Sequence, residues 1–351
     1  MAGKTGKNGK TRAFTSVNYS AARLAREKQR REYEQQKKEK LIFALFVVII
    51  LVMILFAILI FKKVLGNDEP IDAESGTDTV ETSADTENPP VVASAYRNEV
   101  LAKKEIYTGT LLLIDSSHSY RAAETVDIQN VYSSRTKFDK ASAKNGYVYS
   151  YYTAGTEEEL ESQTLAALNA MADEFYKLKG NNDLYIHTNS AYVKNALDEH
   201  ATGRAFDLSV YTIDYIHYEL NDPAVSSDFD WIKQNYYKYG FIRRYPENKA
   251  SITGVSDEPY HFLYVGIPHA YYMYKNDLCL EEYLELLRTE HSFADEGKNN
   301  LVFTTEDGSR YEVYYVAADG DMVNVPVLAD SESYTVSGDN AGGFVVTVKL
   351  K

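Results

Sequence analysis

The most prominent feature of the hydrophobic pattern is an uninterrupted run of 21 apolar residues at positions 41–61. As an α-helix this run would be about 32 Å long, which is enough to cross the hydrocarbon core of a bilayer. A secretory signal peptide has a shorter apolar region, of about 7–15 residues, followed by a small-residue cleavage site. Here the run is longer, and Lys62 and Lys63 follow it. We therefore predict one uncleaved transmembrane helix over residues 41–63.

The two segments that flank this run differ in charge. Residues 1–40 contain 12 Lys and Arg against 4 Asp and Glu, whereas residues 66–90 contain eight acidic residues and no basic one. Lys and Arg beside a membrane helix favour the cytoplasmic side. An acidic segment with few apolar residues stays extended, because it cannot bury enough surface to become ordered. We predict a basic cytoplasmic tail at 1–40, a disordered linker at 64–94, and an extracellular location for the remainder.

Shorter periodic segments fill the region 95–292, which we interpret as one domain. Thr156 and Glu159 have the spacing of a helix capping box, and apolar residues then recur at helical spacing up to Gly180. Continuous or alternating apolar runs predict strands. We expect helices from the capping box to Gly180, at 229–239 and at 281–288, and strands at 110–115, 147–152, 183–187 and 260–266.

The pattern changes near Asn300, where short strand-like runs replace the helical periodicity. The pairs Asp307-Gly308 and Asp319-Gly320 are typical of tight turns between strands. Residues 293–351 therefore predict a small β-rich module with strands at 301–305, 311–316 and 344–348. The module shows no set of catalytic side chains, so a binding module and a structural cap both remain open.

Composition and charge narrow the chemistry. One cysteine, Cys279, excludes an internal disulfide and a thiolate-rich zinc cluster, so a metal must be held by nitrogen and oxygen ligands. The formal net charge is −14, and residues 64–351 hold 23 basic against 47 acidic residues, a net of −24. This acidic balance argues against nucleic-acid binding, and the basic N-terminal segment is explained by the neighbouring membrane helix.

Two compact blocks carry the candidate chemistry. The first contains His200 and Asp207, and the second contains Glu258 and His261. A catalytic zinc site needs three nitrogen or carboxylate ligands, one open position for water, and a base that is not itself a ligand. We therefore predict His200, Asp207 and His261 as metal ligands and Glu258 as the base. The other histidines are expected to be structural or at the surface, with contact to the substrate or to a metal ligand left open for His187, which is nearest in sequence to the first block.

These blocks resemble the signatures of the VanY-type D-alanyl-D-alanine carboxypeptidases, which show Ser-x-His-x-x-Gly-x-Ala-x-Asp and then Glu-Pro-Trp-His. The resemblance implies an α+β fold: a small antiparallel sheet with flanking helices carries the zinc site, in a group that includes the lysostaphin-like and hedgehog-like zinc folds. In this chain the transmembrane helix would precede that domain and the β-rich module would follow it. Matching residues are His200, Gly203, Ala205 and Asp207, then Glu258, Pro259 and His261.

The chain also departs from the family pattern. Where the family has Ser-Gly-Tyr-Arg, whose arginine holds the terminal carboxylate of the substrate, this chain has Val193. Lys194 or Arg204 could supply the missing charge, or the ligand could lack that carboxylate. Tyr260 replaces the tryptophan of the second block, and Asp198 replaces the serine of the first. By resemblance, the candidate substrate-binding residues are Lys194, Arg204, Tyr260, Arg244 and Tyr192.

The leading hypothesis is a membrane-anchored zinc carboxypeptidase that trims peptidoglycan stem peptides ending in D-Ala-D-Ala. An alternative is a related cell-wall endopeptidase or dipeptidase, which Val193 favours because an internal bond offers no carboxylate to hold. A third possibility is a non-catalytic, zinc-containing wall-binding protein. Retention of Glu258 argues against it, since a structural metal needs no base.

Overall fold

The structure is a computed structural model that describes residues 95–351, apart from 122–125, 188–189, 213–215 and 295–296. The predicted cytoplasmic tail, transmembrane helix and acidic linker lie outside these described residues. Within the described ranges, no helix is both long enough and apolar enough to cross a membrane.

A six-stranded sheet forms the centre of residues 95–292, in which the sequence predicts a catalytic site and which we therefore call the catalytic region. The strand order is β10-β11-β8-β7-β5, and β9 also pairs with β8. All pairings are antiparallel except the one between β5 and β7. The α+β class predicted from the sequence is confirmed. The strands are β5 (Tyr152–Thr153), β7 (Leu184–Ile186), β8 (Ala205–Tyr211), β9 (His217–Tyr218), β10 (Phe241–Arg243) and β11 (His261–Tyr264).

The longest helix among the described residues, α3 (Ser162–Lys179), covers one face of this sheet with the apolar face that the periodicity predicts. It ends at Gly180 in the left-handed conformation, as expected. The predicted start is wrong. Glu161, not Thr156, is the N-cap and accepts a hydrogen bond from the Thr164 amide. The reason is that β6 (Glu159–Glu161) pairs with β2 (Ile128–Asn130), so residues of the expected first turn are extended.

The remaining helices are short and lie mostly in the second half of the catalytic region. The predicted helix at 229–239 is divided into α4 (Asp230–Asn235) and the 3₁₀ turn Tyr236–Tyr239, which ends at Gly240. The other elements are η1 (Lys103–Tyr107), α2 (Val131–Ser134), β3 (Lys137–Asp139), β4 (Tyr147–Tyr149), η2 (Glu199–Thr202), η3 (Ser227–Phe229), η5 (Glu247–Lys249), α5 (Ala250–Thr253), α6 (Ile267–Lys275) and α7 (Leu280–Glu290).

The predicted strand at 110–115 is not formed. Leu111 and Ile114 are buried, but this segment belongs to no sheet. Instead, the Leu111 amide donates to Ser337 Oγ at 2.9 Å, and the Leu113 amide donates to the Asp339 carbonyl at 3.0 Å. The apolar run therefore indicated burial correctly, but burial alone does not imply strand pairing.

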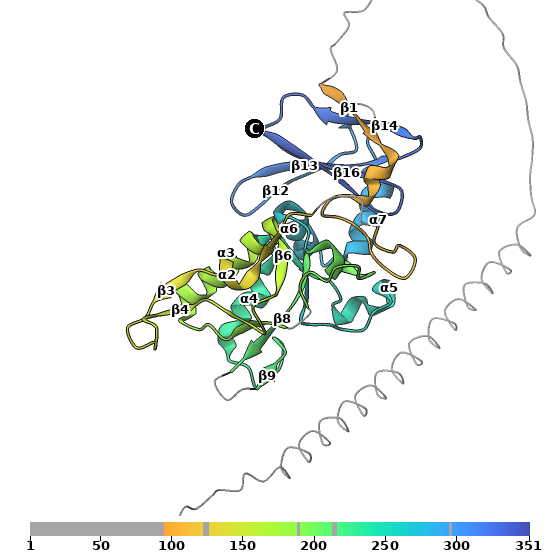
Figure 1. Cartoon of the computed structure of the whole chain (residues 1–351). Helices are drawn as coiled ribbons and strands as arrows, with labels where there is room; N and C mark the ends of the chain where they lie inside the picture. Colours follow the sequence, from red (N-terminus) through yellow and green to blue (C-terminus); the bar gives the residue numbers. More distant parts are fainter. Residues whose placement is uncertain (1–94, 122–125, 188–189, 213–215, 295–296) are drawn as a thin grey trace, which may run out of the picture. The chain divides into compact units, whose positions relative to one another are not determined.

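The C-terminal sheet has the strand order β12-β13-β16-β15. A separate ribbon packs with it, in which β1 from the start of the described chain pairs with β14; Figure 1 shows these two strands, orange and blue, side by side. The three expected strands are present, and β1, β14 and β15 were not predicted. The strands are β1 (Tyr96–Ala102), β12 (Leu301–Thr304), β13 (Arg310–Ala317), β14 (Met322–Leu328), β15 (Ser333–Gly338) and β16 (Gly343–Lys349).

The catalytic region and the C-terminal sheet share a hydrophobic core. Leu263 of β11 and Leu284 of α7 belong to the same buried cluster as Val313 of β13 and Val345 of β16. Helix α7 packs directly against β13. The C-terminal sheet therefore supports the catalytic region by packing against α7.

Candidate metal centre

The pairing of two central strands brings the two sequence blocks together. In the antiparallel register of β8 and β11, His261 lies directly opposite Asp207. His200 reaches the same place from the 3₁₀ turn η2, which ends at Gly203 with a positive φ of 69°. A Cβ at Gly203 would lie 2.8 Å from Ile128 Cδ1 and 3.0 Å from the Glu161 amide nitrogen. Glycine is therefore required at this turn both by conformation and by space.

His200, Asp207 and His261 converge closely. Nδ1 of His261 lies 2.9 Å from Asp207 Oδ1, and Nε2 of His200 lies 4.0 Å from the same oxygen. The two imidazole centroids are 4.9 Å apart. In the described part of the chain, these three residues form the group whose nitrogen and oxygen atoms could hold one metal ion, all within 4.8 Å of one another.

The donor set fits zinc. Two imidazoles and one carboxylate are ligands that zinc commonly takes, and three protein ligands leave the fourth tetrahedral position open. Asp207 Oδ1 faces both rings. On the far side of each ring, His200 Nδ1 and His261 Nε2 are buried and have no hydrogen-bond partner among the described residues. His200 Nε2 and His261 Nδ1 are the natural ligand atoms, because they lie on the same side as Asp207 Oδ1.

Glu258 lies next to these three residues. Its backbone carbonyl accepts a hydrogen bond from the His261 amide, which fixes the turn that leads into β11. Burial raises the pKa of the Glu258 carboxyl, and the carboxylates of Asp207 and Glu199 raise it further, against the opposing effect of His261 and His200. A carboxylate with a raised pKa is better suited to accept and return a proton near neutral pH.

A buried ionic network supports His261 from behind. The Arg244 guanidinium is fully buried and donates to Glu199 Oε1 at 2.9 Å and to the two Glu281 oxygens at 3.0 and 2.7 Å. Tyr245 donates to Glu199 as well, and its ring stacks on the His261 ring at 5.3 Å. Glu199 Oε2 lies 3.9 Å from His261 Nε2. The sequence-based assignment of Arg244 to the substrate is therefore corrected, because both carboxylates enclose its guanidinium.

A pocket of about 340 Å³ opens beside Asp207. Of the predicted substrate-binding residues, Tyr260 lines it. Sequence reasoning missed Ser209, although it follows Asp207 by two residues in β8 and so lies on the same face of the sheet. It also missed His217, which pairing with Tyr211 brings to the pocket from β9. The lining residues are His187, Asp207, Ser209, His217, Tyr218, Glu219 and Tyr260.

The electrostatic character of this pocket is unusual for a site that would hold a carboxylate. Among the described residues that line it, none is a lysine or an arginine. Burial lowers the pKa of His187, so its imidazole is neutral near pH 7. The Ser209 hydroxyl is buried and makes no hydrogen bond within the described chain. The pocket therefore offers neutral hydrogen-bonding groups and the carboxylates of Asp207 and Glu219, and no guanidinium or ammonium group among the described lining residues.

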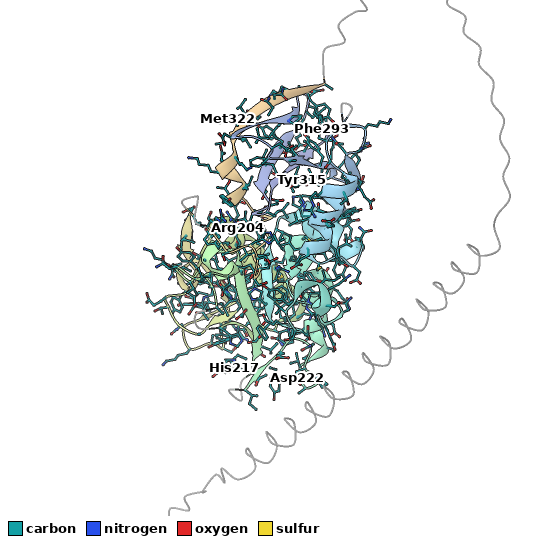
Figure 2. The ribbon with its side chains drawn as sticks, turned by 90° about the vertical axis from the view of Figure 1, so that its right-hand side faces the viewer. Arg204, His217, Asp222, Phe293, Tyr315 and Met322 are labelled. Atoms are coloured by element: carbon teal, nitrogen blue, oxygen red, sulfur yellow. The ribbon has the colours of Figure 1, made fainter. Side chains whose placement is uncertain are left out.

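The other predicted substrate contacts lie elsewhere. Arg204 donates to the Gly109 carbonyl at 2.8 Å and lines a different cavity. Figure 2 shows Arg204 towards the sheet that carries Tyr315, and His217 at the opposite end of the catalytic region. Lys194 is exposed, and Tyr192 is partly buried and donates its amide to the Glu159 carbonyl. The structure thus does not bring Lys194, Arg204 or Tyr192 to the pocket beside Asp207.

Comparison with known proteins agrees with the geometry. The family model described as VanY, D-alanyl-D-alanine carboxypeptidase, matches residues 81–267, which is more than half of the 351 residues. The chain belongs to the VanY family. The resemblance inferred from the two sequence blocks is therefore confirmed.

Individual relatives cover different shares of the chain. A D-alanyl-D-alanine carboxypeptidase of Enterococcus faecium is 27% identical over 308 residues, which cover 83% of this chain and 94% of that protein. A bifunctional D-Ala-D-Ala dipeptidase and carboxypeptidase, VanXYC of Enterococcus gallinarum, is 38% identical over 123 residues, 34% of this chain and 62% of that protein. The crystal structure of the D,D-dipeptidase VanXYg with a D-Ala-D-Ala phosphinate analog superposes with a TM-score of 0.56 at 25% identity, covering 72% of this chain and 99% of that one.

Proposed function

We propose that this protein is a zinc-dependent peptidase that removes the terminal D-alanine from peptidoglycan stem peptides ending in D-Ala-D-Ala. The observation that carries the proposal is the convergence of His200, Asp207 and His261 within 4.8 Å, beside Glu258. Membership of the VanY family supports the substrate class.

The chain's own residues have separate tasks at this site. His200, Asp207 and His261 would hold the ion, which when bound supplies Lewis acidity and lowers the pKa of a coordinated water to about 7. Tyr245 stacks on the His261 ring and restricts its orientation, and the Glu199 carboxylate lies behind that ring, 3.9 Å from its Nε2. The Glu258 carboxylate accepts the proton of the attacking water and then donates it to the leaving amine.

A dipeptidase or endopeptidase activity is the second candidate, and the pocket beside Asp207 favours it. No cationic side chain of the described residues lines this pocket, and Glu219 contributes a carboxylate. A substrate that presents an amide or an ammonium group there would meet less repulsion than a terminal carboxylate. The bifunctional relative from Enterococcus gallinarum shows that both activities occur among the relatives of this chain. A non-catalytic zinc protein is disfavoured, because Glu258 would then have no task.

The proposed location is outside the cell, on a single membrane anchor with a cytoplasmic N-terminus. It rests on the apolar run at 41–61 and on the basic residues that precede it. At that location the catalytic region would face the cell wall.

The decisive experiment measures free D-alanine released from a pentapeptide ending in D-Ala-D-Ala by the intact, zinc-loaded protein. We expect release by the unchanged protein, and its loss in Glu258→Gln with the bound zinc retained. Glu290→Gln, at an exposed position at the end of α7, is the matched control and should keep full activity. Cleavage of an internal bond or of the free dipeptide instead would support the second candidate. Zinc binding without cleavage of any muropeptide would refute both.

A further inference from the structure

A second cavity lies between the catalytic region and the C-terminal sheet. Its volume is about 460 Å³, larger than that of the pocket beside Asp207. One wall is the segment from Tyr264 to His269 that links β11 to α6, and the other wall is β15. Within the described chain, the two cavities share no lining residue. We call this second cavity the inter-sheet groove.

The groove presents aromatic rings that neighbouring residues hold in place. Tyr334 of β15 is 36% exposed, its hydroxyl donates to Glu99 of β1 at 3.2 Å, and Arg97 lies over its ring at 5.2 Å. Tyr264 packs edge-on against Phe241 at 5.7 Å. Such fixed rings offer flat apolar faces to a ligand without the entropy cost of ordering them first.

Between the rings, the lining consists largely of hydroxyl groups. Thr110 comes from the catalytic side, and Ser333 and Thr335 come from the exposed first half of β15. β15 is an edge strand of its sheet in the described structure, so its outer backbone groups in that half also face the groove. Hydroxyls and peptide groups can each donate and accept hydrogen bonds, which matches a ligand rich in hydroxyl and amide groups.

The charges in the groove argue against an anionic ligand. Lys349 is paired with Glu332 at 2.9 Å, Arg204 donates to the Gly109 carbonyl, and Glu161 adds a carboxylate. Because both cations already have hydrogen-bond or ion-pair partners and a carboxylate lies beside them, the positive potential in the groove is too weak to attract a phosphate or an acidic peptide. A purely apolar partner also fits poorly, because Ile267 is the one large aliphatic side chain among the described lining residues that is more than a third exposed.

Combining these features, we propose that the inter-sheet groove binds the glycan of peptidoglycan, with sugar rings stacked on Tyr334 and Tyr264. A pyranose has apolar ring faces and polar edges, which correspond to the rings and the hydroxyls of the lining. This inference rests on the proposed function, since it places the sugar end of the same substrate.

The groove and the pocket lie close together along β8 but on different sides of it. Arg204, which lines the groove, and Asp207, which lines the pocket, are three residues apart, roughly 10 Å in an extended strand, and side chains three residues apart leave opposite faces of a strand. The four stem residues that precede the cleaved bond can reach at most about 14 Å. On this assignment the peptide passes around the N-terminal end of β8 between the two sites.

The test compares two substrates for the intact protein: a free pentapeptide, and the same pentapeptide attached to its disaccharide. We expect the unchanged protein to have a KM about tenfold lower for the glycosylated substrate, with similar kcat. Tyr334→Ala and Thr335→Ala should each remove most of this preference and leave the free pentapeptide unaffected. Tyr132→Ala is the matched control, because Tyr132 is 40% exposed and lines neither cavity.

Equal KM values for the two substrates in the unchanged protein would overturn the glycan assignment. So would a preference that persists in both groove variants. If the variants weaken binding of the free pentapeptide equally, the groove binds peptide along β15 rather than sugar. If the unchanged protein releases D-alanine from neither substrate, the proposed function fails instead. Calorimetric titration with the peptide-free disaccharide then tests the groove alone, and absence of binding, or binding unaffected by Tyr334→Ala, refutes the inference.

Discussion

The buried guanidinium of Arg244 allows a quantitative test of how the metal centre is supported. Its side chain is 0% exposed, and its two carboxylate partners, Glu199 and Glu281, have side chains that are 3% and 15% exposed. Burial alone would lower the pKa of Arg244, but the two carboxylates outweigh it and raise that pKa above its ordinary value. The guanidinium is therefore charged at every accessible pH.

Substitution Arg244→Met keeps much of the side-chain volume but leaves both carboxylates without their cation. Removing one partner of a buried ion pair typically costs about 3–5 kcal/mol, because the remaining charge stays desolvated. We expect a decrease of that size in the free energy of unfolding, or a melting temperature roughly 10 °C lower for a protein of this size. The matched control is Arg243→Met, since Arg243 and its partner Asp257 are 27% and 26% exposed. The control should lose no more than about 1 kcal/mol.

The assay is thermal or urea unfolding of the intact protein in a mild detergent, with circular dichroism as the measured signal. The deficit should also depend on pH in a defined direction. Unpaired buried carboxylates have raised pKa values in the folded state, so the folded variant binds more protons than the unfolded one and gains stability as pH falls. The deficit at about pH 7 should therefore shrink towards about pH 5. A loss below about 1 kcal/mol, or one equal to that of Arg243→Met, would refute the reasoning.

Three further predictions concern the centre itself. Glu199→Gln should weaken zinc binding about 10- to 100-fold in a chelator competition, because the group behind His261 loses its charge; unchanged affinity would show that Glu199 does not act on that ring. The pKa of the Glu258 carboxyl is raised above its ordinary value of 4.5, so its carboxylate form is lost as pH falls through that raised pKa. We therefore expect kcat/KM to decline at acid pH with an apparent pKa above 4.5. An apparent pKa at or below 4.5 would contradict the assignment of Glu258 as the base. Gly203→Ala should cost more than the roughly 1–2 kcal/mol of left-handed strain alone, since its Cβ would meet Ile128 and the Glu161 backbone. Gly254→Ala, at a similar φ with nothing within 4 Å, gives the strain alone for comparison in the same unfolding measurement.

The amino-acid sequence alone determined the local features of this protein. The apolar periodicity between Leu165 and Phe175 identified the buried face of α3, because helix geometry places residues three and four apart on one side; the predicted face extended too far, since Leu160 lies in β6 and Leu178 is exposed. Only the pairing of β8 with β11 brings the two blocks together, but the residue types and spacing within each block, with the resemblance to the VanY signatures, indicated His200, Asp207, Glu258 and His261 as candidates. These inferences need no knowledge of distant contacts.

Only the tertiary structure decided which separate segments meet. The pairing of β1 with β14 joins the first described strand to one more than 200 residues later, and the sequence pattern of neither strand predicts which strand it pairs with. Arginine is a residue type that often binds a substrate carboxylate, so Arg244 was a reasonable candidate. In the structure Glu199 and Glu281 enclose it, and their positions in the sequence do not predict this. Strand pairing likewise decides the position of His217 at the pocket, and packing between distant segments forms the inter-sheet groove. The physical reason is that periodicity reports the environment of a side chain, whereas the identity of its neighbours depends on long-range packing that many segments determine together.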